Sequence, residues 1–518
     1  MKINKIFILL LIACFVSLYY KLFLFRNVDL YLSSDSAIYG SLAVRFAKGD
    51  FFHAMHLWWF PLYPFISGIT YIFVSKIEYA LFFVNALSSS ILIIPLYLIL
   101  KKITKSLLIA IAGALAASLN YTLIVSHINL LSEMTYILML LFSVCSFFIA
   151  LQSLSRKNIS IAGFCFGLAF LTRSEAIFFF IPSIIFLFFY LLYRKDAFSV
   201  LFTRIILFVI AFCICISPYV IFNYLQYKSV NLSAKSNAAF KMGSPFAIDR
   251  NGRNFAQDVW SIDAPNYQSF YFLEPYRFND HYSQLLEAGI IRIKIYVAYI
   301  VRVTNPLLLL VATIGFILLL YKSKHEKEFI YIPYIFVVGF LLTMPFLTQA
   351  ENRYIYWIYP FGYLFIFTVI GYLAKFFLQG VSSKIFYLLL FLIIGGYVFM
   401  NSHVIAMTKV NEQYGSSYKK IGEIIKKQNI KEPKVMTRIE AIAFYSDGKT
   451  VYIPISINYN QLLEYAKKTK TDFIIVDKLM FLPDSKLYTL LNDKVDYPGL
   501  KRIADFHDTI KTSIYKVL

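Results

Sequence analysis

The stretch Ser33–Pro64, SSDSAIYGSLAVRFAKGDFFHAMHLWWFPLYP, directly follows a hydrophobic run and yet mixes charged side chains with tryptophans, tyrosines and prolines. Its ionisable residues are Asp35, Arg45, Lys48, Asp50, His53 and His56. A connector between two membrane spans would be shorter and would carry fewer such groups. The first half, SSDSAIYGSLAVRFA, is typical of a helix start in which Ser33, Ser34 or Asp35 is the N-cap. We therefore interpret the stretch as a segment on a membrane surface, around which the rest of the chain is arranged.

The composition outside this stretch is that of a polytopic membrane protein. Hydrophobic residues make up 59% of the chain, aromatic residues 19% and charged residues 15%, whereas globular proteins have about 25% charged residues. The mean hydropathy is +0.65. A net charge of +21 would suggest nucleic acid in a soluble protein, but many of the basic residues lie in short loops between apolar runs, so we expect no nucleic-acid partner. All five cysteines lie in apolar runs, which argues against a disulfide framework and a metal site.

Hydrophobic runs predict about eleven membrane crossings of roughly 17–25 residues each. The first runs from about Ile6 to Phe25 and ends in LYYKLFLF, which has no small-residue cleavage site, so we interpret it as an uncleaved anchor. Further spans begin near Tyr79, Lys105, Asn129, Ile159, Ala176, Leu201, Ile295, Phe329, Tyr354 and Ile385. The interiors of these spans carry almost no charge.

The basic loops predict the orientation of the chain. If the N-terminus is cytoplasmic, the inner loops are 101–105, 156–157, 194–204, 322–327 and 375–384, and each is basic. The positive-inside rule then predicts a multi-pass protein of the cytoplasmic (inner) membrane. This orientation places two loops, about 26–78 and 223–294, on the extracytoplasmic side of the membrane, together with everything after about Asn401. We interpret the loop 223–294 as an ordered cap whose role the sequence does not specify.

The chain after the last span has the periodicity of a soluble domain. KKIGEIIKKQ and NQLLEYAKK are typical of helices, and KVMTRI, TVYIPI and DFIIVD of strands. The sequence thus predicts a membrane domain over residues 1–401 and an extracytoplasmic α/β domain over 402–518. The second has no glycine-rich nucleotide fingerprint, so no cofactor is assigned to it, and a structural or acceptor-docking module is expected.

Several ionisable residues far apart in the sequence map to the outer ends of the predicted spans. They are Asp35 after the first span, Glu133 at the start of the fourth, Arg173 and Glu175 at the turn after the fifth, and Arg353 before the tenth. Charges beside membrane spans are costly and tend to mark function. Their convergence at one face predicts a site for a lipid-linked substrate whose head group lies at the interface.

Each of these residues also has a structural interpretation. Asp35 is placed to cap a helix, and Glu133 to interact favourably with a helix dipole. Arg173 and Glu175 are placed to pair with each other, and Arg353 to anchor on lipid phosphate. His53 and His56, three residues apart, are spaced to share a metal ion on one helical turn, but the sequence offers no clear third ligand, so a divalent metal has no support.

The order of five motifs, SSDSAIYGSLAVRFAKGDF, WWFPLYPF, NLLSEMTY, TRSEAI and ENRYIYWIYP, resembles the GT-C superfamily of membrane glycosyltransferases. Within it, the chain is similar to bacterial members of glycosyltransferase family 39, which include protein O-mannosyltransferases and aminoarabinose lipid A transferases. The resemblance covers the membrane region and, through VMTRIEAIAFYSDGKTVYIP, the start of the C-terminal domain.

The resemblance implies an inverting transfer of one sugar from a polyprenyl-phosphate carrier to an envelope lipid, glycan or protein on the outer face of the membrane. It maps the catalytic acids onto Asp35 and Glu133. Donor phosphate and substrate would be bound among Tyr39, Arg45, His53, His56, Arg173, Glu175, Arg353 and Tyr354. The chain departs from the family where some members have Lys-Pro-Pro and this one has Trp59-Phe60-Pro61. One phosphate contact must therefore come from an arginine or from Lys48.

The chemistry of such a transfer suits these residue types. A carboxylate accepts the proton of a hydroxyl or amine acceptor, and a cation stabilises the departing phosphate. Asp35 as general base and Arg353 as bidentate phosphate clamp would fill both roles. Two other classes stay open. A lipid-linked sugar flippase would need polar residues near the bilayer midplane, and an O-antigen polymerase or ligase is not expected to carry the C-terminal domain or the early acidic loop.

Overall fold

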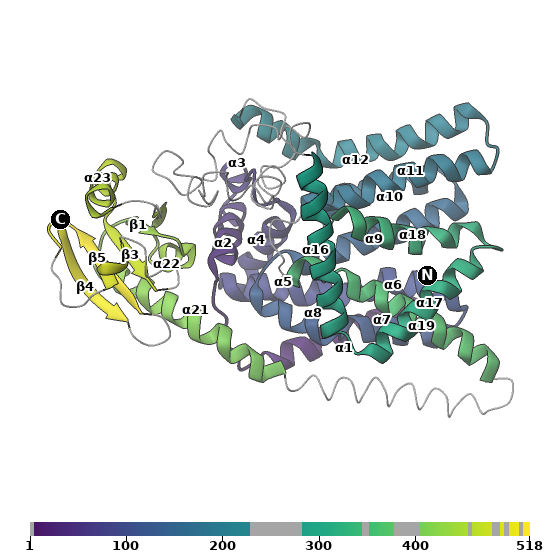
Figure 1. Cartoon of the computed structure of the whole chain (residues 1–518), viewed down its shortest axis with the longest axis horizontal. Coiled ribbons are helices and arrows are strands. Elements are labelled where there is room, and N and C mark those ends of the chain that lie inside the picture. Colours follow the sequence, from purple (N-terminus) through teal and green to yellow (C-terminus); the bar gives the residue numbers. More distant parts are fainter. Residues whose placement is uncertain are drawn as a thin grey trace.

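The computed structural model describes residues 5–227, 282–343, 352–377, 404–453, 458–478, 487–491, 497–506 and 511–518. They form a bundle of helices and a smaller C-terminal domain around a β-sheet, with α2 and α4 lying between the two in Figure 1. The chain is thus a multi-pass α-helical membrane protein with a C-terminal α/β region, as the sequence predicts. The predicted cap, 223–294, lies mostly outside the described residues.

The helices of the first half of the bundle alternate with short turns. They are α1 (Lys5–Leu24), α2 (Ser34–Ala47), α3 (Phe51–Ala54), α4 (Leu62–Val74), α5 (Ile77–Ile91), α6 (Ile93–Thr104), α7 (Leu107–Ser118), α8 (Tyr121–Ser126), η1 (His127–Asn129), α9 (Glu133–Ser153), α10 (Arg156–Phe170), η2 (Ser174–Ala176), α11 (Ile177–Tyr193) and α12 (Phe198–Tyr227). The later helices are α16 (Tyr282–Val303), α17 (Pro306–Lys322), η5 (Lys327–Ile330), α18 (Tyr331–Thr343), η7 (Asn352–Ile355) and α19 (Ile358–Phe377).

Helix α9 is at the centre of the bundle. It is apolar on all sides, and 78% of its most hydrophobic window is buried inside the protein. A helix without a polar face is stable only where other helices surround it. It packs against α5, α6, α10 and α18, so its first residue, Glu133, is held at a fixed position at one end of the core.

The described residues contain fewer candidate membrane crossings than the eleven predicted for the whole chain. Within the described ranges, six helices are long and apolar enough to cross a membrane, or up to eight if each bent pair makes one span. The span predicted near Ile295 is bent by 115° between α16 and α17, where Asn305 caps the new helix and Pro306 starts it. The span predicted from Ile385 lies outside the described residues. The predicted count is therefore not confirmed.

Three of the predicted inner loops meet at one end of the bundle. Lys322 Nζ donates to the backbone carbonyl of Ile103 at 2.9 Å, and Lys327 Nζ lies 5.8 Å from the ring centre of Tyr193. These turns adjoin the C-terminal end of α9, because Tyr190 Oη donates to the carbonyl of Leu151. Glu133 is at the other end of that helix, about 30 Å away for a helix of this length.

One charged side chain lies inside the bundle, where almost none was expected. Lys21 in α1 is 0% exposed. Its Nζ donates to the hydroxyls of Ser89 at 2.8 Å, Ser90 at 3.1 Å and Ser118 at 3.0 Å. None of the ion pairs in the described part of the chain includes it. Its ammonium is solvated by hydroxyls alone.

We expect Lys21→Met to raise the free energy of unfolding by about 1 kcal/mol or more, because it removes a buried charge without a carboxylate partner. Ser89, Ser90 and Ser118 also donate to backbone carbonyls, so they stay satisfied. Thermal unfolding of the purified protein measures the effect, and Lys76→Met at an exposed position is the control. A lower midpoint for Lys21→Met would show that the ammonium contributes net stability.

The C-terminal domain contains a five-stranded mixed sheet with strand order β2-β1-β3-β5-β4. Its elements are α21 (Val404–Lys426), β1 (Lys434–Thr437), α22 (Glu440–Tyr445), β2 (Lys449–Tyr452), α23 (Tyr459–Thr469), β3 (Phe473–Asp477), η9 (Tyr488–Leu491), β4 (Leu500–Phe506) and β5 (Thr512–Val517). β1 pairs in parallel with β2 and β3, while β5 pairs antiparallel with β3 and β4. The helices and strands predicted here are confirmed, whereas α22, β4 and β5 were not predicted.

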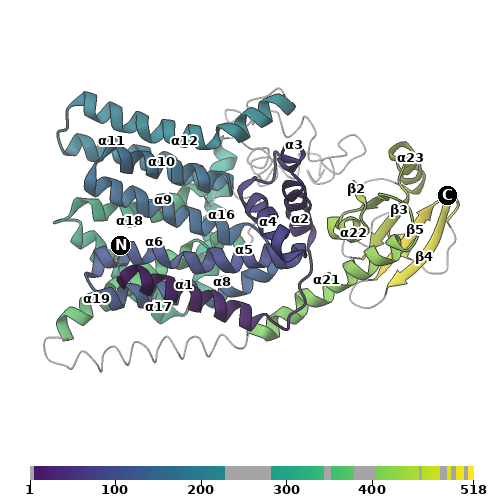
Figure 2. The same ribbon diagram turned by 180° about the vertical axis from the view of Figure 1, so that it is seen from behind.

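The two faces of this sheet have different neighbours. Met436, Ile474 and Val476 face α23 in a small core of their own. The alternate residues, Val435 and Phe473 among them, belong to a core that also contains residues of α2 and α5. The period-2 alternation of the strands thus joins the C-terminal domain to the predicted outer stretch. Figure 2 shows α22 on the side of the domain that faces α2.

Candidate active site

Asp35 lies in the first turn of α2. The N-cap of this helix is Ser33, whose backbone N–H donates to Ser36 Oγ at 2.6 Å. Asp35 therefore does not cap the helix, and its side chain is 41% exposed. Of the two interpretations of Asp35, helix cap and functional carboxylate, the structure excludes the first.

Glu133, Arg173 and Glu175 form a buried ion-pair group. Arg173 Nη1 is 2.8 Å from Glu133 Oε1, and its Nη2 is 2.7 Å from Glu175 Oε1. The three side chains are only 7%, 8% and 10% exposed for Arg173, Glu133 and Glu175. Burial by itself would lower the pKa of Arg173, but the two carboxylates raise it well above its usual value. Arg173 is thus a permanent cation held between two acids.

Arg353 in η7 joins Asp35 to this group. Its Nη1 is 2.9 Å from Asp35 Oδ2, and its Nε is 3.9 Å from Glu133 Oε1. Its side chain is 22% exposed. The ring of Tyr354 lies 5.1 Å from the guanidinium of Arg173 and 5.5 Å from that of Arg353, within cation–π range of both. Residues 318 positions apart are thereby brought into one cluster.

Tyr39 lies one helical turn after Asp35, and its hydroxyl is 3.0 Å from that of Ser132, the N-cap of α9. Burial raises the pKa of Tyr39. Its phenol therefore stays protonated and ties α2 to the start of the helix that carries Glu133. Seven of the ten residues predicted for the site are gathered here: Asp35, Tyr39, Glu133, Arg173, Glu175, Arg353 and Tyr354.

The other three predicted residues lie elsewhere. Arg45 is ten residues after Asp35, about 15 Å along the helix, and its Nη1 donates to the carbonyl of His53 at 2.7 Å. His53 Nδ1 is 2.8 Å from the carboxylate of Asp50. His56 is buried, which lowers its pKa to about 4, so it is neutral, and its Nδ1 accepts from the N–H of Trp58. No group of three or more metal-ligating side chains was found among the described residues.

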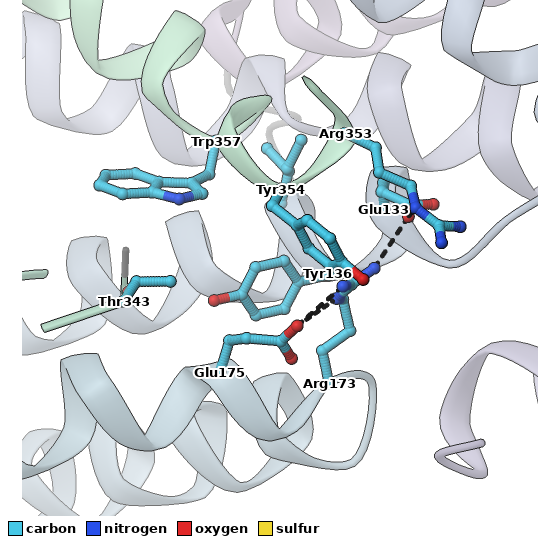
Figure 3. Close-up of a pocket in the computed structure, with 9 residues that line it drawn as sticks. Glu133, Tyr136, Arg173, Glu175, Thr343, Arg353, Tyr354 and Trp357 are labelled. Carbon is cyan, nitrogen blue, oxygen red and sulfur yellow. Dashed lines mark hydrogen bonds and ion pairs between the residues drawn. The ribbon is translucent and has the colours of Figure 1, made fainter. Parts of the chain in front are cut away.

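Glu133, Arg173, Glu175, Arg353 and Tyr354 line a small pocket together with four residues that were not predicted for the site. These four are Tyr136, Ile137, Thr343 and Trp357. Figure 3 shows the rings of Tyr136 and Tyr354 beside the Arg173 guanidinium, with Glu175 on one side and Glu133 on the other. Tyr136 follows Glu133 by three residues on one helix, so helical spacing was a signal for it in the sequence. Trp357 lies in the turn between η7 and α19, for which the spacing gives no such signal.

Residues 60–222 match the family model of dolichyl-phosphate-mannose-protein mannosyltransferases. This match covers less than half of the chain. The chain is similar to the solved structure of ArnT from Cupriavidus metallidurans bound to undecaprenyl phosphate, with 13% identity, a TM-score of 0.53, and coverage of 98% of this chain and 97% of that one.

A second likeness is to the archaeal oligosaccharyltransferase AglB from Archaeoglobus fulgidus, solved with an inhibitory peptide and a dolichol-phosphate. The identity is 11% and the TM-score 0.51, over 90% of this chain and 69% of that one. At such identities these likenesses show the fold. No curated protein matches the chain in sequence.

The aromatic segment Trp59-Phe60-Pro61 is buried in the protein. Phe60 lies between the rings of Phe170 and Tyr219, at centroid distances of 5.3 Å and 5.2 Å. Tyr63 is edge-on to Tyr39 at 5.1 Å. The segment therefore seats the outer stretch on the bundle and supports Tyr39.

An apolar groove of about 690 Å³ lies next to the charged cluster. It runs between α8, α16, α17, α18 and α19, and its lining includes Ile300, Leu308, Phe316, Phe340, Ile358 and Gly362. The cluster and the groove share one segment, because Arg353, Tyr354 and Trp357 line the first while Ile355 and Ile358 line the second. The ring of Phe336, on the groove, is 5.9 Å from that of Trp357.

Proposed function

We propose that this protein is a membrane glycosyltransferase of the GT-C superfamily. It moves a single sugar from a polyprenyl-phosphate carrier to an acceptor of the cell envelope, at the outer face of the cytoplasmic membrane and with inversion at the anomeric carbon. The observation that carries the proposal is the apolar groove beside a cluster containing two arginines. A polyprenyl-phosphate sugar has these two parts, a long apolar chain and a charged head. The solved ArnT complex with undecaprenyl phosphate supports the same class of donor.

The two arginines have different roles in this proposal. Arg173 is enclosed by two buried carboxylates, and exchanging either for a ligand would leave a buried charge unpaired. Arg353 is more exposed and pairs with Asp35, which is itself partly exposed. Arg353 is therefore the cation that changes partner. When its guanidinium binds the donor phosphate, a carboxylate oxygen of Asp35 becomes available to the acceptor.

The transfer then proceeds in one displacement. The acceptor oxygen or nitrogen forms a bond to the anomeric carbon while its proton passes to Asp35. The bond from the anomeric carbon to the phosphate oxygen breaks, and its electron pair leaves on the polyprenyl phosphate, whose charge Arg353 stabilises. Because attack and departure occur on opposite sides of the carbon, the configuration inverts. Glu133 holds Arg173 and lies near Arg353, so it sets the position of the cation.

The face at which this happens follows from the basic turns. They lie at the end of α9 opposite to Glu133, and the positive-inside rule assigns such turns to the cytoplasm. The cluster and the C-terminal domain are then extracytoplasmic, where envelope acceptors are available.

Gly362 allows a direct test of the groove. It lines the groove, and a Cβ added there meets nothing within 4 Å. We expect Gly362→Phe to leave the fold intact and to fill space that the carrier chain needs. Displacing even two or three methylenes costs about 0.8 kcal/mol each, so undecaprenyl phosphate should bind at least about tenfold more weakly.

Binding is measured by native mass spectrometry of the full chain in nanodiscs with undecaprenyl phosphate, alongside release of sugar from the lipid-linked donors of a cell extract. Gly362→Ala is the matched control and should resemble the parent protein. If Gly362→Phe binds undecaprenyl phosphate as tightly as the parent protein, the groove is not part of the donor site. Absence of any sugar release by the parent protein would overturn the proposed function.

A further inference from the structure

The C-terminal domain contacts the outer stretch beside Asp35. Ser34 Oγ donates to the carbonyl of Arg438 at 3.3 Å. Tyr445 Oη accepts from the N–H of Leu32 at 3.0 Å and donates to Glu78 Oε1 at 3.1 Å. The bonds from Leu32 and Ser34 lie just before Asp35 in the sequence, and α2 packs along α22. The first turn of α2 is therefore held by both domains.

Glu440, the first residue of α22, is buried at this contact. It is 8% exposed. Its Oε1 accepts from Tyr452 Oη at 2.6 Å, whereas its Oε2 is buried and accepts no hydrogen bond from the described residues. Burial raises the pKa of Glu440, and the nearby Asp35 carboxylate raises it further. A buried carboxylate oxygen without a donor is costly unless something else supplies the hydrogen bond.

A purely structural role would not require this arrangement. The bond from Tyr452 uses one oxygen of Glu440, and a glutamine would accept it equally well through its amide oxygen. Hydrogen bonds from the Ser34 and Tyr452 side chains to the Glu440 carboxylate lower its pKa in part. The second oxygen places another acceptor group beside the proposed general base, on an element of a different domain.

We propose that Glu440 is a positioning residue for the acceptor, and that the acceptor is a glycan. This inference rests on the proposed function. Asp35 and Glu440 together present carboxylate oxygens that accept hydrogen bonds, and a sugar ring offers neighbouring hydroxyls that donate them. One hydroxyl gives its proton to Asp35 and attacks, while a second donates to Glu440 Oε2. A serine or threonine side chain has a single hydroxyl and would use only Asp35.

The test uses the full-length protein in nanodiscs and cells that lack its gene. A lipid extract of such cells grown on radiolabelled glucose supplies the donor, and their unlabelled polysaccharide and protein fractions supply two acceptors. We expect the label to enter the polysaccharide fraction. Glu440→Gln should raise the KM for that fraction about tenfold while the KM for the lipid donor stays within about twofold. Glu440→Asp should recover part of the effect.

The matched control is Glu464→Gln, an exposed glutamate in α23 of the same domain, which should leave both KM values within about twofold. Thermal unfolding and undecaprenyl phosphate binding check that each variant is folded, and Glu440→Asp replaces Glu440→Gln if the latter is not. Label in the protein fraction, an unchanged acceptor KM, or an equal loss for donor and acceptor would each overturn the inference. Label in neither fraction, with sugar still released from the lipid donor, would also overturn the inference, whereas absence of any sugar release by the parent protein would overturn the proposed function itself.

Discussion

Asp35→Asn is expected to lower the rate of sugar transfer by about 10²–10⁴-fold, the range by which a general base contributes. The substitution removes the proton acceptor and keeps the shape. An asparagine oxygen still accepts from Arg353 Nη1, which now lies 2.9 Å from Asp35 Oδ2. The fold and donor binding should therefore survive, and the loss should appear in kcat. Single-turnover transfer from lipid-linked donor measures it.

The control for this variant comes from the same outer stretch. Asp50→Asn removes an exposed carboxylate that bonds to His53, remote from the cluster, and transfer should stay within about twofold of the parent rate. Transfer by Asp35→Asn at the parent rate would exclude Asp35 as the base. The proposed exchange of Arg353 from Asp35 to the donor phosphate would then not be needed for catalysis.

Arg173→Met is expected to have the largest effect on stability. It leaves Glu133 and Glu175 buried without the cation that both contact at under 3 Å. Removing one member of a buried ion pair costs about 3–5 kcal/mol, because the remaining charge is uncompensated. Chemical unfolding of the purified protein measures the difference, and activity should be lost with the structure.

Two further variants test whether the loss of stability comes from the uncompensated glutamates and not from loss of a cation in general. Adding Glu133→Gln and Glu175→Gln to Arg173→Met removes the stranded charges and should restore much of the stability without restoring activity. Lys449→Met breaks an exposed pair with Glu432 and should leave the free energy of unfolding nearly unchanged. An Arg173→Met protein as stable as the parent would mean that the two glutamates are neutral in the fold.

The convergence of charges was predictable because the bilayer restricts where charges can lie. Asp35, Glu133, Arg173 and Arg353 each follow or precede an apolar run, so the alternation of spans already assigns them to one face. The sequence could not indicate which of them pair. That Arg173 is locked between two glutamates while Arg353 bonds to Asp35 depends on how α9, α10 and η7 meet.

Proximity along the chain misdirected the site assignment in one place. Arg45, His53 and His56 lie close to Asp35 in sequence, yet the length of α2 carries them away from the cluster. Conversely, Glu440 is 405 residues further on and lies beside Asp35 because the sheet of the C-terminal domain docks on α2. Residues at opposite ends of a helix are far apart in space although they are close in sequence. Docking of one domain on another brings together residues that are far apart in sequence.

The sequence by itself determined that this is a multi-pass membrane protein with a small C-terminal α/β domain, and at which ends of the helices its charges lie. Those properties follow from hydrophobic runs, basic turns and period-2 or period-3.6 alternation, which are local. Only the tertiary structure decided that Asp35 is paired rather than capping, that Lys21 is buried among serines, and that an apolar groove adjoins the cluster. Pairing, burial and cavities depend on contacts between elements far apart in the chain. Local sequence patterns do not specify these contacts.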